Sequence, residues 1–134
     1  MKKTIVCAVL YLVVLFAACS KDTDDKLDGK WQLQEVTTNN VTEKVDTVFY
    51  NFLTTTFMYQ IYDKKSDSYS QIYGLKTSLE ENKILIEMVP SESIPSFLPR
   101  TDWGSPEKTF TIEKITGSRL ILNSEGKRYN FRKF

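Results

Sequence analysis

Short alternating runs of apolar and polar residues fill the chain from Gly29 to Phe134, and this pattern constrains the fold more than any other feature. The runs are rich in aromatic and β-branched residues, and residues typical of turns separate them. Alternation with a period of two is typical of strands that bury one face. The pattern predicts eight strands, over Gly29–Thr37, Asp46–Leu53, Thr55–Asp63, Ser68–Thr77, Lys83–Val89, Lys108–Thr116, Arg119–Asn123 and Lys127–Phe134.

The connections between most runs are short, and strands joined by tight turns pair antiparallel. Gly117 and Gly126 each supply a glycine to one of these turns. No run keeps an apolar period of 3.6 residues, so we expect an all-β fold. An eight-stranded antiparallel meander removes its exposed edges by closing into a β-barrel. The interior of such a barrel is filled by side chains or holds one small ligand.

The segment from Pro90 to Pro106 interrupts the strand pattern and contains all four prolines of the chain. Proline cannot donate to a strand ladder, so this segment is not a central strand. It also carries Ile94, Phe97, Leu98 and Trp103, which is too apolar for an ordinary exposed loop. Two interpretations remain open. The segment is a lid that plugs one end of the barrel, or it is a ligand gate or partner-binding loop that uses Phe97, Leu98 and Trp103.

Tyrosines in the predicted strands are further candidates for ligand contact. Tyr50, Tyr59 and Tyr73 each combine an apolar face with a polar tip, which suits a barrel core and a ligand cavity alike. The alternative for each is ordinary packing, since aromatic alternation is a normal strand signal.

Composition excludes several classes of protein. The chain has 134 residues, a net charge of +1, two Cys and no His. Without His there is no Ser-His-Asp or Cys-His catalysis and no His-containing zinc site, and two Cys are too few for a four-Cys metal site. A nearly neutral chain has no electrostatic footprint for nucleic acid. We therefore expect no catalytic residues, no cofactor, no metal and no nucleic-acid partner.

The beginning of the chain has the layout of a secretory signal, with cationic Met1–Lys3, an apolar run over Ile5–Ala18, and small residues before Cys19. The apolar run is shorter than the roughly 20 residues that a membrane-spanning helix needs. The sequence therefore predicts a signal peptide over residues 1–18. The alternatives are a retained transmembrane anchor and a plain secretory signal that leaves Cys19 as a free thiol.

Phe16-Ala17-Ala18-Cys19 resembles the bacterial lipobox, which ends in a cysteine that becomes acylated. The resemblance implies lipid on Cys19, a polar tether over residues 19–26 and a folded domain over 27–134. Two or three acyl chains anchor a protein firmly, whereas one chain binds only marginally. Ser20–Asp25 is similar to the acidic tag of surface-exported lipoproteins of Bacteroidetes. The implied location is the bacterial envelope, most simply the outer membrane, with surface and periplasmic placement both open.

Gly29-Lys30-Trp31, at the head of the first run, resembles the Gly-x-Trp start of lipocalins. The layout from Leu27 to Phe134 is similar to that of small lipocalin-like lipoproteins of Bacteroidetes. The resemblance implies a lipocalin-like barrel, here without the C-terminal helix of typical lipocalins. It also implies that Trp31 closes one end of the barrel beneath an arginine of the last strand, Arg132 or else Arg128, in a cation–π contact.

Together these features predict a non-enzymatic, membrane-anchored lipoprotein with a lipocalin-like barrel. In the first hypothesis the barrel binds a small apolar or amphipathic ligand. In the alternative the barrel is filled, and the protein contacts a partner at the envelope or inhibits a hydrolase.

Overall fold

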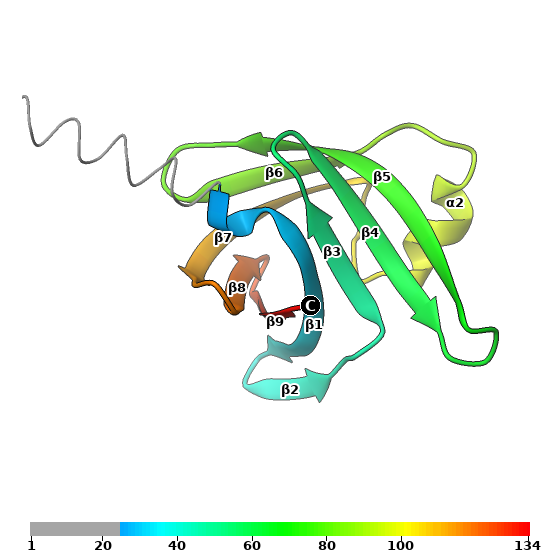
Figure 1. Cartoon of the computed structure of the whole chain (residues 1–134), viewed down its shortest axis with the longest axis horizontal. Helices are drawn as coiled ribbons and strands as arrows, with labels where there is room; N and C mark the ends of the chain where they lie inside the picture. Colours follow the sequence, from blue (N-terminus) through cyan, green and yellow to red (C-terminus); the bar gives the residue numbers. More distant parts are fainter. Residues whose placement is uncertain (1–24) are drawn as a thin grey trace, which may run out of the picture.

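The structure is a computed structural model that describes residues 25–134 (Figure 1). The predicted signal peptide, Cys19 and most of the predicted tether lie outside the described residues. The elements in chain order are β1 (Gly29–Thr38), β2 (Val41–Lys44), β3 (Val48–Phe52), β4 (Thr56–Asp63), β5 (Ser68–Ser78), β6 (Lys83–Met88), α2 (Ile94–Phe97), η1 (Leu98–Arg100), β7 (Glu107–Ile115), β8 (Arg119–Ser124) and β9 (Lys127–Lys133).

The strands form one antiparallel sheet that closes on itself. Its order is β2-β1-β3-β4-β5-β6-β7-β8-β9, and β1 also pairs with β9. Strands β1 and β3 to β9 therefore make a closed eight-stranded barrel, which confirms the predicted fold class (Figure 1). The eight predicted runs correspond to these eight strands, with ends that differ by two residues at most. Closure pairs every barrel strand on both sides and so protects its edges.

Strand β2 was not predicted from the sequence. It forms a hairpin with the second half of β1, around a turn in which Asn39 and Asn40 adopt φ values of 50° and 65°. Asparagine tolerates this left-handed conformation better than most residues, which suits a two-residue hairpin turn. All four residues of β2 are exposed, so the strand lacks the half-buried alternation on which sequence prediction depends.

The centre of the barrel is filled by side chains. The largest fully buried ones include Trp31, Tyr50, Phe110, Tyr129 and Phe131. Tyr50 makes ring contacts with several other aromatic residues, at centroid separations from 4.8 Å to 6.3 Å. Side chains of this size fill a barrel of eight strands without leaving a central channel. Space for a ligand therefore has to be sought at the ends of the barrel.

Candidate functional site

The segment between β6 and β7 folds over one end of the barrel, which we call the mouth. It contains α2 and η1, and over residues 90–106 only Phe97 and Trp103 are buried. The Phe97 ring lies 5.5 Å from that of Tyr59, edge to face. This arrangement matches the interpretation of the segment as a lid that plugs one end of the barrel. We call residues 90–106 the plug segment.

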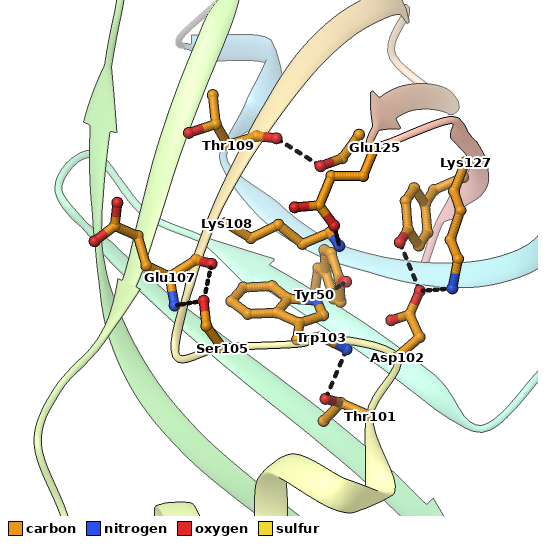
Figure 2. Close-up of polar contacts among 12 residues, drawn as sticks. Tyr50, Thr101, Asp102, Trp103, Ser105, Glu107, Lys108, Thr109, Glu125 and Lys127 are labelled. Atoms are coloured by element: carbon orange, nitrogen blue, oxygen red, sulfur yellow. Dashed lines mark hydrogen bonds and ion pairs between the residues drawn. The ribbon is translucent and has the colours of Figure 1, made fainter.

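Trp103 is the innermost residue of the plug segment, and its side chain is 4% exposed. Its indole Nε1 donates a hydrogen bond of 2.9 Å to the hydroxyl oxygen of Tyr50, deep in the barrel (Figure 2). Its backbone N–H donates to the Thr101 hydroxyl at 3.0 Å, and that hydroxyl donates to the carbonyl of Leu98 at 2.8 Å. A buried indole N–H needs an acceptor, and Tyr50 supplies it.

Asp102, next to Trp103, ties the plug segment to β9. Its Oδ2 atom accepts a hydrogen bond of 2.5 Å from the Tyr129 hydroxyl and lies 3.4 Å from Lys127 Nζ (Figure 2). The side chains of Lys127 and Asp102 are 32% and 30% exposed, so the ion pair is only partly screened by water. Trp103 and Asp102 are neighbours in the chain and both hold the plug segment in place. Trp103 does so through Tyr50 in the core, and Asp102 through Tyr129 and Lys127 of β9.

The tyrosine hydroxyls below the plug segment remain protonated at neutral pH. Burial raises the pKa of Tyr50 and Tyr59 well above the ordinary value. Burial is also the main reason why the pKa of Tyr129 is raised, and its hydrogen bond to Asp102 adds to the effect. These hydroxyls are therefore neutral hydrogen-bonding groups and are poor candidates for general bases.

A pocket of about 400 Å³ lies at the mouth, partly open to solvent. Its wall is mostly aliphatic and its rim carries charge. It lies between the β1–β2 hairpin, the start of β3, the plug segment and the start of β9. The residues that line this mouth pocket are Leu33, Val36, Thr38, Val41, Glu43, Val45, Val48, Tyr59, Arg100, Thr101, Asp102 and Lys127.

Of the residues predicted to contact a ligand or partner, only Tyr59 lines the mouth pocket. Tyr50 is fully buried in the core, and Tyr73 points outward from β5 with 59% of its surface exposed. Phe97 and Trp103 are 5% and 4% exposed, so neither is accessible to a partner protein in this conformation. Leu98 is partly buried and packs against the core.

At the opposite end of the barrel, which we call the closed end, the cation over Trp31 is Lys133 rather than the expected Arg132. Lys133 Nζ lies 4.6 Å from the centre of the Trp31 ring. Trp31 is directly opposite Lys133 in the ladder between β1 and β9, whereas Arg132 is opposite Gln32 and donates to its Oε1 at 3.0 Å. Opposed residues share a face of the sheet, so Arg132 lies on the outer face. The other candidate, Arg128, pairs with Glu113.

Sequence reasoning missed most of the mouth pocket. Val41 and Glu43 belong to the unpredicted strand β2, while Asp102 and Lys127 come together only when the barrel closes. One signal was available, because Asp102 is an acidic residue next to Trp103, the largest aromatic residue of the plug segment. Within residues 25–134, no group of three side chains is placed to hold a metal ion, and no helix is long and apolar enough to cross a membrane.

Comparison with known proteins agrees with this geometry. The profile of the lipocalin-like domain family matches residues 14–134. The chain belongs to this family. The lipocalin-like domain is also similar to a lipocalin-like protein from Bacteroides uniformis ATCC 8492, whose crystal structure is known. The two are 31% identical with a TM-score of 0.69, over 81% of this chain and 99% of the other.

An uncharacterised protein from Bacteroides eggerthii DSM 20697, also solved by crystallography, is 33% identical to this lipocalin-like chain. Its TM-score is 0.68, and the match covers 81% of this chain and 99% of the other. No curated protein matches the sequence. These relatives support the lipocalin-like fold, and the function has to be argued from the site.

Proposed function

We propose that this protein is a lipid-anchored, non-enzymatic binding protein of the bacterial envelope, which holds a small amphipathic molecule in its mouth pocket. The observation that supports this proposal is the pocket itself. It is a partly open space of about 400 Å³ with an aliphatic wall and a charged rim, next to a barrel centre that is already filled. Ligand sites are commonly concave, mostly apolar and equipped with a few polar groups.

The lining indicates how such a ligand lies. Val36, Val45 and Val48 offer apolar surface to a short aliphatic or alicyclic body. The lining carries two cations, Arg100 and Lys127, and two carboxylates, Glu43 and Asp102. Lys127 is paired with Asp102, so Arg100 is the cation better placed to attract a polar or anionic head group. Arg100 has a hydrogen bond of 2.8 Å to the Ser70 hydroxyl, which leaves further guanidinium donors for a ligand. The volume is at the lower end of the range for ligand pockets, so the ligand is small.

A binding role rather than a catalytic one fits the same lining. The Thr101 hydroxyl already donates to a backbone carbonyl, and no imidazole exists anywhere in the chain to activate a hydroxyl. Asp102 is held by Tyr129 and Lys127, which keeps its carboxylate in a structural role.

Anchoring through Cys19 is part of the proposal and rests on the lipobox-like sequence. The folded domain starts close behind this position, because Leu27 is fully buried and its carbonyl accepts a hydrogen bond of 2.8 Å from Trp31 Nε1. Residues 19–26 would span at most about 3 nm when fully extended. An acylated Cys19 would therefore keep the closed end of the barrel within that distance of the membrane surface.

The binding proposal is tested with octanoate as the probe and a matched pair of variants. Val41 lines the pocket and is 63% exposed, whereas Leu53 is 62% exposed and lies outside the pocket. Glutamate is tolerated at both positions, because neither side chain contributes much to the core. We expect Val41→Glu to weaken octanoate binding about tenfold in calorimetric titrations, or about 1.4 kcal/mol, since it removes apolar wall and places a second carboxylate beside that of the probe.

Leu53→Glu leaves octanoate binding unchanged in the same titrations. If both variants bind octanoate with the same affinity, octanoate binds outside the mouth pocket. Native mass spectrometry of the protein isolated from bacterial membranes adds a second readout, in which a small molecule is retained by the wild type and lost in Val41→Glu.

A second candidate function is contact with a protein partner of the envelope, and the filled barrel centre favours it. The contact residues would then lie on the outer wall, where Tyr73 is 59% and Phe134 is 63% exposed. Crosslinking in intact cells with Tyr73→Ser against wild type distinguishes the two functions. Loss of a specific crosslinked protein in this variant supports partner contact, and an unchanged pattern counts against it.

A further inference from the structure

The plug segment is held in the mouth by few buried groups. Over residues 90–106, Phe97 and Trp103 are buried, and the other residues are exposed or only partly buried. The α-helix α2 has four residues and no side-chain cap at its start. Segments with little buried apolar surface open at a lower free energy than the rest of a domain. Apart from the bonds of Trp103 to Tyr50 and of Asp102 to β9, few contacts of the plug segment would resist its opening while the strands stay paired.

The space that Trp103 occupies is an aromatic cage. The Phe57 ring is stacked on the indole, with a centroid separation of 6.0 Å and an interplanar angle of 17°. Tyr50, Tyr59 and Phe110 surround it at 6.3 Å, 5.7 Å and 5.9 Å, with steeper ring angles. These arrangements are favourable for a planar aromatic guest.

The cage also contains one specific polar group. The Tyr50 hydroxyl oxygen accepts from Trp103 Nε1 at 2.9 Å, and the ring of Tyr59 lies 5.0 Å from that of Tyr50. Tyr50 is fully buried beneath the indole, so a guest that takes the place of the indole would cover this hydroxyl in the same way. A guest that lacks a donor would leave the lone pair of Tyr50 unsatisfied.

The cage adjoins the mouth pocket. Tyr59 contributes to both, and Thr101 and Asp102 of the plug segment line the pocket just above Trp103. Displacement of Trp103 would join the two spaces. A molecule that enters the mouth pocket would then reach the cage without any change in the strands.

We infer that the cage around Trp103 is a second binding site, which the indole of the protein itself occupies, for a planar aromatic molecule with an N–H or O–H donor. This inference rests on the proposed function, because the guest reaches the cage through the mouth pocket. In this inference the indole of Trp103 occupies the site when it is empty of ligand, and an aromatic molecule from outside displaces it.

The first experiment removes the internal ligand. Trp103→Ala opens an apolar cavity, and such cavities bind rings of matching shape. We expect indole to bind this variant in calorimetric titrations and to raise its Tm, and benzofuran, which has the same shape without the donor, to bind about fivefold more weakly. Tyr50→Phe in the same background should abolish this preference. Equal binding of the two probes, or none, would overturn the inference.

The second experiment uses the wild-type protein and does not depend on the folding of a variant. The chain has two tryptophans, so ¹⁵N-tryptophan labelling gives two indole N–H signals in NMR spectra. Trp31 serves as the internal control, because it is fully buried at the closed end. Unlabelled indole should shift the Trp103 signal and accelerate its exchange with solvent, and should leave Trp31 unchanged. A Trp103 signal that stays constant up to the solubility limit of indole contradicts the inference.

Failure of the proposed function and failure of the inference have different signatures. If octanoate does not bind wild type but indole binds Trp103→Ala with a preference over benzofuran, the cage is supported and the mouth-pocket function is not. If octanoate binding is sensitive to Val41→Glu but indole leaves both variant and wild type unaffected, the cage is rejected alone.

Discussion

The Nζ atom of Lys133 lies 4.6 Å from the centre of the Trp31 ring and donates a hydrogen bond of 2.5 Å to the backbone carbonyl of Asp28. The lysine stem crosses Gly29, where an added Cβ would lie 2.8 Å from Lys133 Cε. Gly29 also has a φ of 125°, which side chains rarely adopt. The Gly-x-Trp sequence and the last strand thus form one unit that closes this end of the barrel.

Gly29→Ala should destabilise the protein by about 2–4 kcal/mol in urea unfolding, because it strains the backbone and displaces Lys133. Gly117→Ala is the control, since a Cβ there has no neighbour within 4 Å. We expect this control to change the free energy of unfolding by less than about 1 kcal/mol. Similar losses in both variants would show that neither the positive φ of Gly29 nor the close approach of Lys133 has an energetic role.

Lys133→Met should lower the free energy of unfolding by about 1–2 kcal/mol, since it keeps the stem but removes the cation–π contact and the hydrogen bond to Asp28. Arg132→Met removes a cation from the outer face, where its partner is Gln32, and should cost less than about 1 kcal/mol. Unfolding followed by tryptophan fluorescence measures both. The reverse order of the two losses would restore Arg132 as the closing residue.

Tyr50→Phe should destabilise the protein by about 1–3 kcal/mol, because the buried N–H of Trp103 then has no acceptor. A double-mutant cycle with Trp103→Phe isolates this hydrogen bond, and we expect a coupling energy of about 1 kcal/mol. A coupling near zero would mean that the indole and the hydroxyl contribute independently.

Stability should fall steeply at alkaline pH, because burial raises the pKa of Tyr50 and Tyr59 above the ordinary value of 10.0. Below pH 10 both tyrosines carry their protons in the folded and unfolded states, so this contribution is fully present. Above pH 10 only the unfolded state releases protons, and each tyrosine lowers the free energy of unfolding by up to about 1.4 kcal/mol per pH unit.

Tyr50→Phe should remove the contribution of Tyr50 and leave those of Tyr59 and Tyr129, whose pKa values are also raised by burial. The difference in slope between wild type and variant cancels the titration of lysines, which both proteins share. Urea unfolding at several pH values from 9 to 11 measures the slopes. Parallel slopes of the two proteins would show that Tyr50 does not keep its proton in the folded state.

Cys19→Ala should release the protein from the membrane fraction of bacterial lysates, since the acyl chains provide the proposed anchorage. Cys7→Ala is the matched control, because Cys7 lies within the predicted signal peptide and carries no lipid in this proposal. We expect the Cys7 variant to remain in the membrane fraction. Retention of the Cys19 variant would contradict lipidation at that residue.

Most of the eight barrel strands were predictable because they carry a half-buried alternation, and β3 and β8 instead contain short runs of buried apolar residues. In β6, for example, Ile84, Ile86 and Met88 point inward and the residues between them are exposed or only partly buried. Strand β2 has no such alternation, since all four of its residues are exposed. It exists because the tight turn at Asn39 and Asn40 brings it alongside β1.

The candidate site was less predictable, because it depends on register and on contacts between distant segments. Strand alternation places Arg128 and Arg132 on the same face of β9, so it did not decide between them. In addition, an irregularity in the pairing of β1 with β9, between Leu33 and Glu35, changes which side chains lie opposite one another. The sequence also does not indicate which lysines are buried. Lys108 is 5% exposed and reaches Glu125 at 3.4 Å (Figure 2).

The β1–β2 hairpin has a consequence for how this fold can change. Val41 and Glu43 line the mouth pocket, yet both are exposed and belong to a strand outside the closed ring. Substitutions there alter the chemistry of the pocket at little cost in folding stability. The part of the proposed pocket that β2 forms can therefore be diversified by selection, in nature or in a mutant library, while the residues that hold the barrel together stay constant.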